Sequence, residues 1–234
     1  MKYTTALFDL DGTLLDFASA ERQGFFAAME KHGIPCNINV YERYSAINDS
    51  LWKAFERKEI TKDEIGTRRY EILFEEMKIT ADAQQVGKDY KAMLAGMGIL
   101  YDGALELCER LISKGVQLYA VTNGTAHIQA NRMAVSGLDK VFIKTFVSEE
   151  VGCQKPDKEY FDYVFKNIEE KDKSKVLIIG DSPTSDIKGG INAGIDTCYF
   201  ATEAHPDINP TYVAGSYEEV EKIILQQKSA GSIL

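Results

Sequence analysis

The chain has 234 residues, 44% of them hydrophobic and 27% charged, which suits one large α/β domain or a core domain with a smaller insert. Its formal net charge of -9 argues against a nucleic-acid polymer as ligand, because binding phosphate chains needs a basic face. The four cysteines lie far apart and form no CxxC pair, so the sequence indicates neither a zinc site nor a disulfide framework.

Hydrophobic segments are short throughout the sequence. No apolar run approaches the roughly 18 residues that a membrane-spanning helix needs. The run after Lys2 is also too short for the hydrophobic part of a signal peptide. We therefore expect a cytoplasmic protein with no membrane partner, and a monomer and a homodimer are both compatible with the sequence.

The first predicted elements are one strand and a long helical region. The segment TTALFDLDGTLL, residues 4–15, begins with an apolar run that is typical of a buried strand over residues 4–9. Residues 17–96 then contain no convincing strand but several amphipathic stretches, one of which opens with Thr61 and Glu64 in a capping-box pattern. These stretches predict an all-helical insert of four helices.

From about residue 100 the pattern changes to an alternation of strands and helices. Short Val- and Ile-rich strands separated by helices predict a parallel sheet that is covered on both faces. The predicted strands cover residues 116–122, 141–148, 175–181 and 195–200. The predicted helices cover residues 103–115, 126–137, 158–170, 184–194 and 216–227.

The first strand has the same buried character as this later series, so we assign it to the same sheet. The predicted fold is α/β, a doubly wound parallel sheet formed by residues 1–16 and 97–234. An all-helical cap domain is expected as an insert at residues 17–96. The chain then crosses between the domains twice, and LAGMGILYDG contains the glycines that a hinge at such a junction tolerates.

Polar residues follow the predicted strands at the edge where ligands of parallel sheets bind. They are Asp9 and Asp11, Thr122, Asn123 and Gly124, Lys155, and Asp181 with Asp186 shortly after it. Carboxylates that converge in one crevice repel one another unless a hard divalent cation shares them, and Mg²⁺ favours carboxylates, water and substrate phosphate. We therefore expect Mg²⁺ as cofactor, with Asp9 and Asp181 as direct ligands.

The Thr-Asn-Gly turn and the nearby lysine supply hydroxyl, amide and ammonium donors, which suit the oxygens of a phosphoryl group. An isolated DxDGT segment also fits an ordinary turn. Here, however, all the polar segments follow apolar strands in an order that one fold can satisfy. The pattern predicts phosphoryl transfer on a small phosphorylated metabolite.

Four motifs, FDLDGT, VTNG, QKPD and IGDSPTSD, together resemble those of the haloacid dehalogenase-like hydrolases. The motifs occur in the family's order, the helical region has the place of the family's cap, and the resemblance covers nearly the whole chain. It implies a Rossmann-like core domain and hydrolysis of phosphomonoesters through an aspartyl-phosphate.

The resemblance implies roles for the three motif aspartates. Asp9 would be the nucleophile and a Mg²⁺ ligand, and Asp181 would be a further ligand. Asp11 would offer its backbone carbonyl to the metal, while its side chain would act as general acid and then as base. Both chemical roles suit carboxyl groups, which serve as covalent nucleophiles and, near an apolar cap, as tuned acids.

The resemblance also implies how the phosphoryl group is held. Thr122, Asn123 and Gly124 would bind its oxygens. Lys155 would neutralise charge between the nucleophile and the phosphate. Asp186 would support the water shell of the metal or orient Lys155.

Within the family, the aspartate at position 11 favours a phosphatase. The name-giving dehalogenases lack this acid and do not need Mg²⁺, and the phosphonate-cleaving relatives usually lack it too. Sugar phosphomutases commonly carry Val or Ile where this chain has Thr13. The alternatives are a phosphatase of a sugar phosphate or phosphoglycolate, a phosphomutase, a haloacid dehalogenase and a non-catalytic sensor of a phosphorylated metabolite.

Three longer segments resemble the bacterial pyrimidine 5'-nucleotidase branch of the family. They are TLLDFASAERQGF, VGCQKPDKEYFDY and GDSPTSDIKGGINAGIDTCYF. The resemblance implies nucleoside monophosphates of pyrimidines as substrates. Pro183 and Gly12 depart from the branch, whose members often have Leu and an acidic residue there, but neither change touches the chemistry.

Substrate choice is expected to depend on the cap and the hinge. Aromatic and arginine side chains of this region can stack on or hydrogen-bond a base or sugar, although aromatic residues at helical spacing more often serve packing. The candidates are Phe17, Tyr41, Tyr44, Trp52, Arg68 and Arg69.

Overall fold

The protein is described from a computed structural model. The described residues are 1–203, 205 and 207–226. The chain forms two compact units, one from Met1–Asp16 with Leu100–Leu234 and one from Phe17–Ile99. The last residue of the predicted helix 216–227 lies outside the described residues.

A six-stranded parallel sheet forms the centre of the first unit, in the order β3-β2-β1-β4-β5-β6. Its strands are β1 (Thr5–Phe8), β2 (Gln117–Thr122), β3 (Lys144–Val147), β4 (Val176–Gly180), β5 (Asp196–Phe200) and β6 (Tyr212–Ala214). In β1, Phe8 pairs with Ala120 of β2 on one side and with Ile179 of β4 on the other. The predicted doubly wound parallel sheet is confirmed, and its first strand lies inside it.

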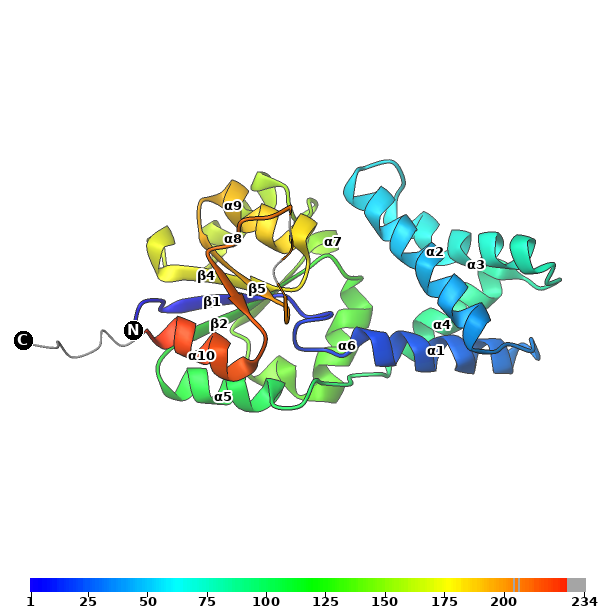
Figure 1. Cartoon of the computed structure of the whole chain (residues 1–234), viewed down its shortest axis with the longest axis horizontal. Helices are drawn as coiled ribbons and strands as arrows, with labels where there is room; N and C mark the ends of the chain where they lie inside the picture. Colours follow the sequence, from blue (N-terminus) through cyan, green and yellow to red (C-terminus); the bar gives the residue numbers. More distant parts are fainter. Residues whose placement is uncertain (204, 206, 227–234) are drawn as a thin grey trace, which may run out of the picture. The chain divides into compact units, whose positions relative to one another are not determined.

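Helices cover both faces of this sheet (Figure 1). On one face lie α5 (Ala104–Ser113), α6 (Ala126–Ser136) and α10 (Tyr217–Leu225). On the other lie α8 (Lys158–Asn167) and α9 (Lys188–Ala193), and the short α7 (Ser148–Val151) follows β3. The result is the three-layer arrangement that alternating strands and helices predict.

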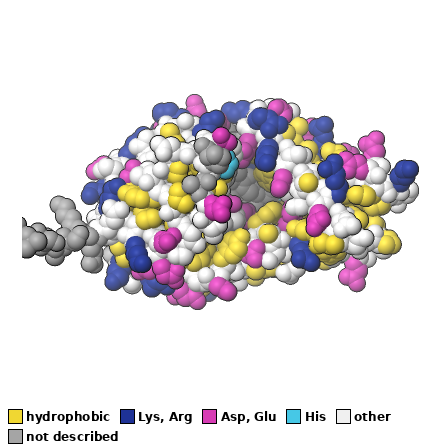
Figure 2. All heavy atoms as spheres, viewed as in Figure 1, with side chains coloured by type: hydrophobic (Ala, Val, Ile, Leu, Met, Phe, Trp, Pro, Cys, Tyr) yellow, Lys and Arg dark blue, Asp and Glu magenta, His cyan; other side chains and the backbone are white. Residues whose placement is uncertain are grey.

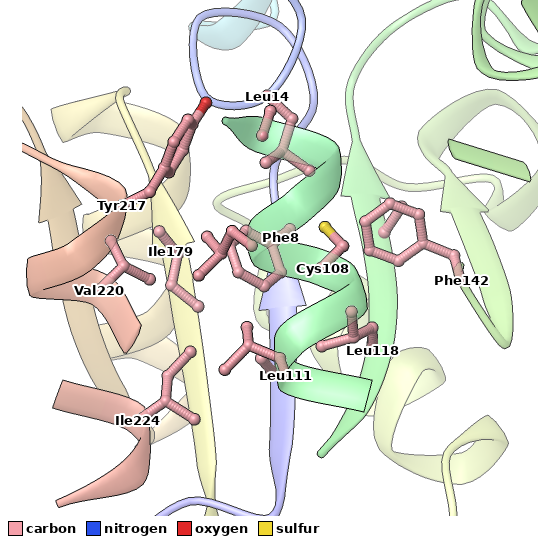
Figure 3. Packing of buried hydrophobic residues seen from close by; sticks show 14 of the residues in the cluster. Phe8, Leu14, Cys108, Leu111, Leu118, Phe142, Ile179, Tyr217, Val220 and Ile224 are labelled. Carbon is pink, nitrogen blue, oxygen red and sulfur yellow. The ribbon is translucent and has the colours of Figure 1, made fainter. Parts of the chain in front are cut away.

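Successive residues of β1 contribute to opposite layers of the core, because side chains alternate along a strand. Phe8 packs in one cluster with Leu111 of α5 and Val220 of α10 (Figure 3). Leu7 belongs to the cluster on the other face, with Val164 of α8. Burial on both faces explains why this strand is a continuous apolar run in the sequence.

Several segments differ from the predicted elements. β3 begins at Lys144 instead of residue 141, and a 3-10 turn over Leu138–Lys140 precedes it. Pro183–Ile187 form a π-helical turn before α9, where the Ser182 hydroxyl accepts a hydrogen bond from the Ser185 amide. β6 was not predicted, because three residues are too few to show a strand period.

The second unit consists of helices. They are α1 (Phe17–Lys31), α2 (Ile38–Glu56), α3 (Lys62–Met77) and α4 (Ala83–Ala95). The Thr61 amide donates to the Glu64 carboxylate at 2.7 Å, which is one half of the predicted capping box. Inside the unit, the Tyr44 ring lies 4.5 Å from that of Phe25 and 5.2 Å from that of Tyr70, measured between centroids. An aromatic core therefore holds these helices together.

The surface mixes charges of both signs. On the face shown in Figure 2, basic and acidic side chains are interspersed. Within the described part of the chain, no helix has both the length and the apolar character needed to cross a membrane.

Two neighbours on α5 test the packing of the core. Leu111 is fully buried, whereas Ile112 is 42% exposed. Leu111→Ala is expected to lower the free energy of unfolding by about 2–5 kcal/mol, because it removes buried carbon atoms and leaves a cavity. Ile112→Ala should change it by less than about 0.5 kcal/mol. Urea unfolding followed by circular dichroism measures both, and equal losses would contradict this packing.

Candidate active site

Three adjacent strands bring predicted site residues to one edge of the sheet. Asp9 follows β1, Thr122 ends β2 and Asp181 follows β4. The Asp9 amide still donates to the Ile179 carbonyl at 2.9 Å, so the sheet itself fixes the position of this residue. Strand order reverses on the two sides of β1, and parallel sheets bind ligands at such a switch point.

A tight loop after β1 carries Asp11 and Gly12. The Leu14 and Leu15 amides both donate to the Leu10 carbonyl, at 2.9 and 2.8 Å. Gly12 has a φ of +82°, and a Cβ there would lie 2.2 Å from Oδ2 of Asp181. Both the turn and this close approach require glycine.

The ammonium of Lys155 joins the end of β1 to the segment after β4. Its Nζ donates to Oδ1 of Asp9 at 2.6 Å, to Oδ1 of Asp186 at 2.6 Å and to the Val121 carbonyl at 2.8 Å. The side chain is 1% exposed. All three N–H groups have acceptors, which is the condition under which a buried charge is tolerated.

The backbone around this lysine is held by Asn123. The Asn123 amide donates to the Lys155 carbonyl at 2.9 Å and its oxygen accepts from the Lys155 amide at 3.0 Å. Asp186 in turn accepts from the Ser182 amide at 3.1 Å. A Cβ at Gly180 would lie 2.3 Å from Cγ of Asp186, so glycine allows this close approach.

Carboxylate oxygens of Asp9, Asp181 and Asp186 lie within 4.8 Å of one another. Lys155 pairs with Asp9 and Asp186, so the three carboxylates and this one ammonium leave two formal negative charges in excess. Hard oxygen donors with this excess suit a divalent cation such as Mg²⁺. The residues therefore fit the metal that the sequence predicts.

Burial shifts the pKa values in this cluster. For Asp9, burial raises the pKa well above its usual range, Lys155 opposes the shift, and Asp186 and Asp181 add to it. Burial and the neighbouring Asp186 raise the pKa of Asp181 to about 7. Burial alone would lower the pKa of Lys155, but Asp186 and Asp9 outweigh it and raise that pKa, so the lysine stays charged. A bound cation would favour the ionised aspartates.

Two residues of α6 join the site, although the sequence analysis did not single them out. Gln129 donates through Nε2 to Asp11 at 2.7 Å and to the Thr122 hydroxyl at 3.0 Å. The Arg132 guanidinium forms an ion pair with Asp11. Gln129 and Arg132 are three positions apart and thus share one helix face. Two long polar side chains on the buried face of a predicted helix were the signal that could have revealed them.

The substrate-specificity candidates all belong to the helical unit, in different environments. Tyr44 and Arg69 are buried in its interior, where the Arg69 guanidinium lies 4.4 Å from the centre of the Tyr90 ring. Phe17, Tyr41 and Trp52 are half-buried, and Arg68 is exposed. Arg69 also donates to Asn48 at 3.0 Å, and Asn48 donates to Glu21 at 2.7 Å. This buried polar network was not predicted.

Comparison with known proteins identifies the family. The model of the haloacid dehalogenase-like hydrolases matches residues 3–194. The chain belongs to this family. The predicted family and the prediction of a hydrolase are confirmed, and the aspartates, lysine and Thr-Asn-Gly turn described above lie within the matched residues.

Relatives of this haloacid dehalogenase-like hydrolase match it over nearly its whole length. The HAD-hydrolase YfnB of Bacillus subtilis is 41% identical, with 95% of this chain and 96% of that protein covered. Its magnesium-bound crystal structure has a TM-score of 0.89 at 40% identity, covering 96% and 99% of the two chains. The pyrimidine 5'-nucleotidases PynA of Streptococcus pneumoniae and YjjG of Escherichia coli are 39% and 31% identical. They cover 94% and 96% of this chain, and 94% and 99% of their own lengths.

The carboxylate cluster predicts an unusual dependence of stability on pH. Folding raises the pKa of Asp181 from 3.8 to about 7, so the folded protein keeps this proton to higher pH than the unfolded chain. Its ionisation therefore lowers the free energy of unfolding as the pH rises from about 4 to about 7. In EDTA, Asp181→Asn is expected to be more stable than the wild type at about pH 8, with a shallower pH dependence.

Urea unfolding across this pH range measures the effect. The exposed Asp102 provides a matched control, because Asp102→Asn removes a carboxylate outside the cluster. An Asp181→Asn protein that is less stable than the wild type at about pH 8 would show that the cluster does not destabilise the metal-free fold.

Proposed function

We propose that this protein is a Mg²⁺-dependent phosphatase of small phosphomonoesters, and that its substrates are pyrimidine nucleoside 5'-monophosphates. One observation supports the chemistry. The buried Asp9 carboxylate lies 2.6 Å from the Lys155 ammonium, and carboxylate oxygens of Asp9, Asp181 and Asp186 lie within 4.8 Å of one another. The substrate class is supported by the near full-length similarity to PynA and YjjG.

In the first step, a carboxylate oxygen of Asp9 attacks phosphorus while the bond from phosphorus to the ester oxygen breaks. Asp11 gives its proton to that leaving oxygen, so the alcohol departs neutral. The phosphoryl group is then bonded to Asp9 as an acyl phosphate. Lys155 and the Thr122 hydroxyl are proposed to offset charge on the phosphoryl oxygens, and the Lys155 ammonium lies 2.6 Å from Oδ1 of Asp9.

In the second step, a water oxygen bonds to phosphorus while the bond from phosphorus to Asp9 breaks. Asp11, now ionised, takes one proton from this water, which restores its acid form and releases inorganic phosphate. Asp9, Asp181 and the Asp11 carbonyl would hold Mg²⁺, which would supply charge neutralisation for the phosphoryl group. Asp186 keeps Lys155 oriented through their ion pair.

The helical unit, Phe17–Ile99, is proposed to select the part of the substrate beyond the phosphate. Phe17, Tyr41 and Trp52 are half-buried, and Arg68 is exposed. Such side chains stack on or hydrogen-bond a nucleobase or sugar. The interior position of Arg69 favours a role in arranging this unit.

The nucleophile is tested by substitution together with a substrate panel. Wild-type protein with Mg²⁺ should release phosphate fastest from pyrimidine nucleoside monophosphates, compared with purine nucleotides, sugar phosphates and phosphoglycolate. Asp9→Asn is expected to lower the rate by about 10⁴-fold or more, because an amide is a poor nucleophile. Asp139→Asn, at an exposed position of the same unit, is the matched control.

Each outcome of the panel has a defined meaning. Fast release of phosphate only from sugar phosphates or phosphoglycolate would support the phosphatase chemistry and contradict a nucleotide substrate. No release from any member of the panel would reject the phosphatase and favour a sensor of phosphorylated metabolites.

Metal binding is tested without turnover. Mg²⁺ is expected to raise the midpoint of thermal unfolding of the wild type, because a ligand that binds the folded state stabilises it. Asp181→Asn should show a much smaller rise, whereas Asp102→Asn should keep the full rise. A Mg²⁺-dependent rise that is equal in all three proteins would place the cation elsewhere.

A further inference from the structure

The side chain of Asp11 is held by two residues of α6 that none of the family motifs contains. Arg132 pairs through Nη1 with Oδ1 of Asp11, and Gln129 donates through Nε2 to Oδ2 at 2.7 Å. Both carboxylate oxygens therefore have a partner on the same helix. Gln129 and Arg132 are each 1% exposed, so their side of this contact is sheltered from water.

The same network reaches the phosphate-binding turn. Nε2 of Gln129 also donates to the Thr122 hydroxyl at 3.0 Å, and Oε1 of Gln129 accepts from Nη1 of Arg132 at 3.2 Å. The Thr122 oxygen further accepts from the Gly124 amide at 3.0 Å. One amide side chain thus ties the carboxyl of Asp11 to the turn after β2.

A stability role alone accounts poorly for this arrangement. Removing a guanidinium from water costs free energy, and replacing a buried ion pair by apolar side chains is often neutral or stabilising. The partner of Arg132 is also 28% exposed, so the pair joins a buried charge to an accessible one. Such a pair fixes the direction of an accessible carboxyl group.

The geometry points to Gln129 and Arg132 as positioning residues that align Asp11 with the phosphate-binding Thr122. This inference rests on the proposed function, in which Asp11 exchanges the proton with the leaving oxygen and then with water. The alignment matters because proton transfer depends on distance and angle at the scale of a hydrogen bond. Neither residue touches the phosphoryl group in this role.

A comparison of two leaving groups separates positioning from general damage. The value of kcat/KM reports the steps up to release of the alcohol, and p-nitrophenolate leaves without a proton, whereas the nucleoside of UMP needs one. Arg132→Met is expected to lower kcat/KM for UMP by about 10²-fold, which is the lower end of the contribution of a general acid. For p-nitrophenyl phosphate, kcat/KM should change by less than about threefold, since no proton is required.

Conservative variants and a control complete the design. Arg132→Lys keeps the charge without the planar fork and should recover about tenfold of the loss on UMP. Gln129→Met, which retains the length of the side chain, should lower kcat/KM for UMP by about tenfold with the same selectivity for the leaving group. Arg110→Met removes a surface arginine that pairs with Glu221, and should change neither value. Thermal unfolding identifies variants that do not fold. If Arg132→Met is one of them, the comparison of the two leaving groups is made with Gln129→Met.

The outcomes distinguish this inference from the proposed function. If the wild type hydrolyses both esters and Arg132→Met and Gln129→Met lose kcat/KM equally for both, the positioning role is overturned. The proposed phosphatase function is retained in that case. Unchanged or faster hydrolysis of UMP in these variants would overturn the positioning role as well. Absence of hydrolysis by the wild type would overturn both.

Discussion

Lys155 places a positive charge in a part of the protein from which water is excluded, and the other site residues are arranged around that charge. Its ammonium meets Asp9, Asp186 and the Val121 carbonyl, which come from three separate segments of the chain. Removing one partner of such a buried pair is far more costly than the pair is stabilising. The ends of β1 and β2 and the turn after β4 must therefore be in place together.

The cluster contains more negative than positive charge, and this excess affects the stability of the protein. Burial raises the pKa values of Asp9 and Asp181, which means that the fold disfavours their ionised forms. The proposed nucleophile, a carboxylate, has to be ionised, so burial opposes the charge state that the proposed chemistry needs. A divalent cation would relieve this conflict, which couples metal binding both to stability and to the chemistry.

Close backbone approach is the second condition of the site. Gly12 lies against Asp181 and Gly180 lies against Asp186, each at a distance where a Cβ would overlap the carboxylate. On the opposite side, Gln129 and Arg132 extend from α6 to Asp11. Backbone contacts thus set the positions of Asp181 and Asp186 in the proposed metal site, whereas long side chains set the position of the proposed acid.

The α/β class and the helical character of residues 17–96 followed from the sequence, as did the grouping of the residues that we propose as the active site. Buried strands such as residues 4–9 end directly in charged residues, and the carboxyl ends of parallel strands meet at one edge. Asp9, Thr122 and Asp181 could therefore be grouped without coordinates. The motifs FDLDGT and QKPD added the family, because such combinations of residues reflect one chemistry.

Only the tertiary structure decided which side chains share a hydrogen bond. Asn123 was expected to bind phosphate, and in the structure its side chain forms two hydrogen bonds with the backbone of Lys155. Gln129 and Arg132 have no signature in the sequence beyond a helix with polar residues on its buried face. Helical periodicity tells which residues share a face but not which strand end that face meets. That depends on the order of the strands and on packing over long sequence separations, such as the 121 positions between Asp11 and Arg132.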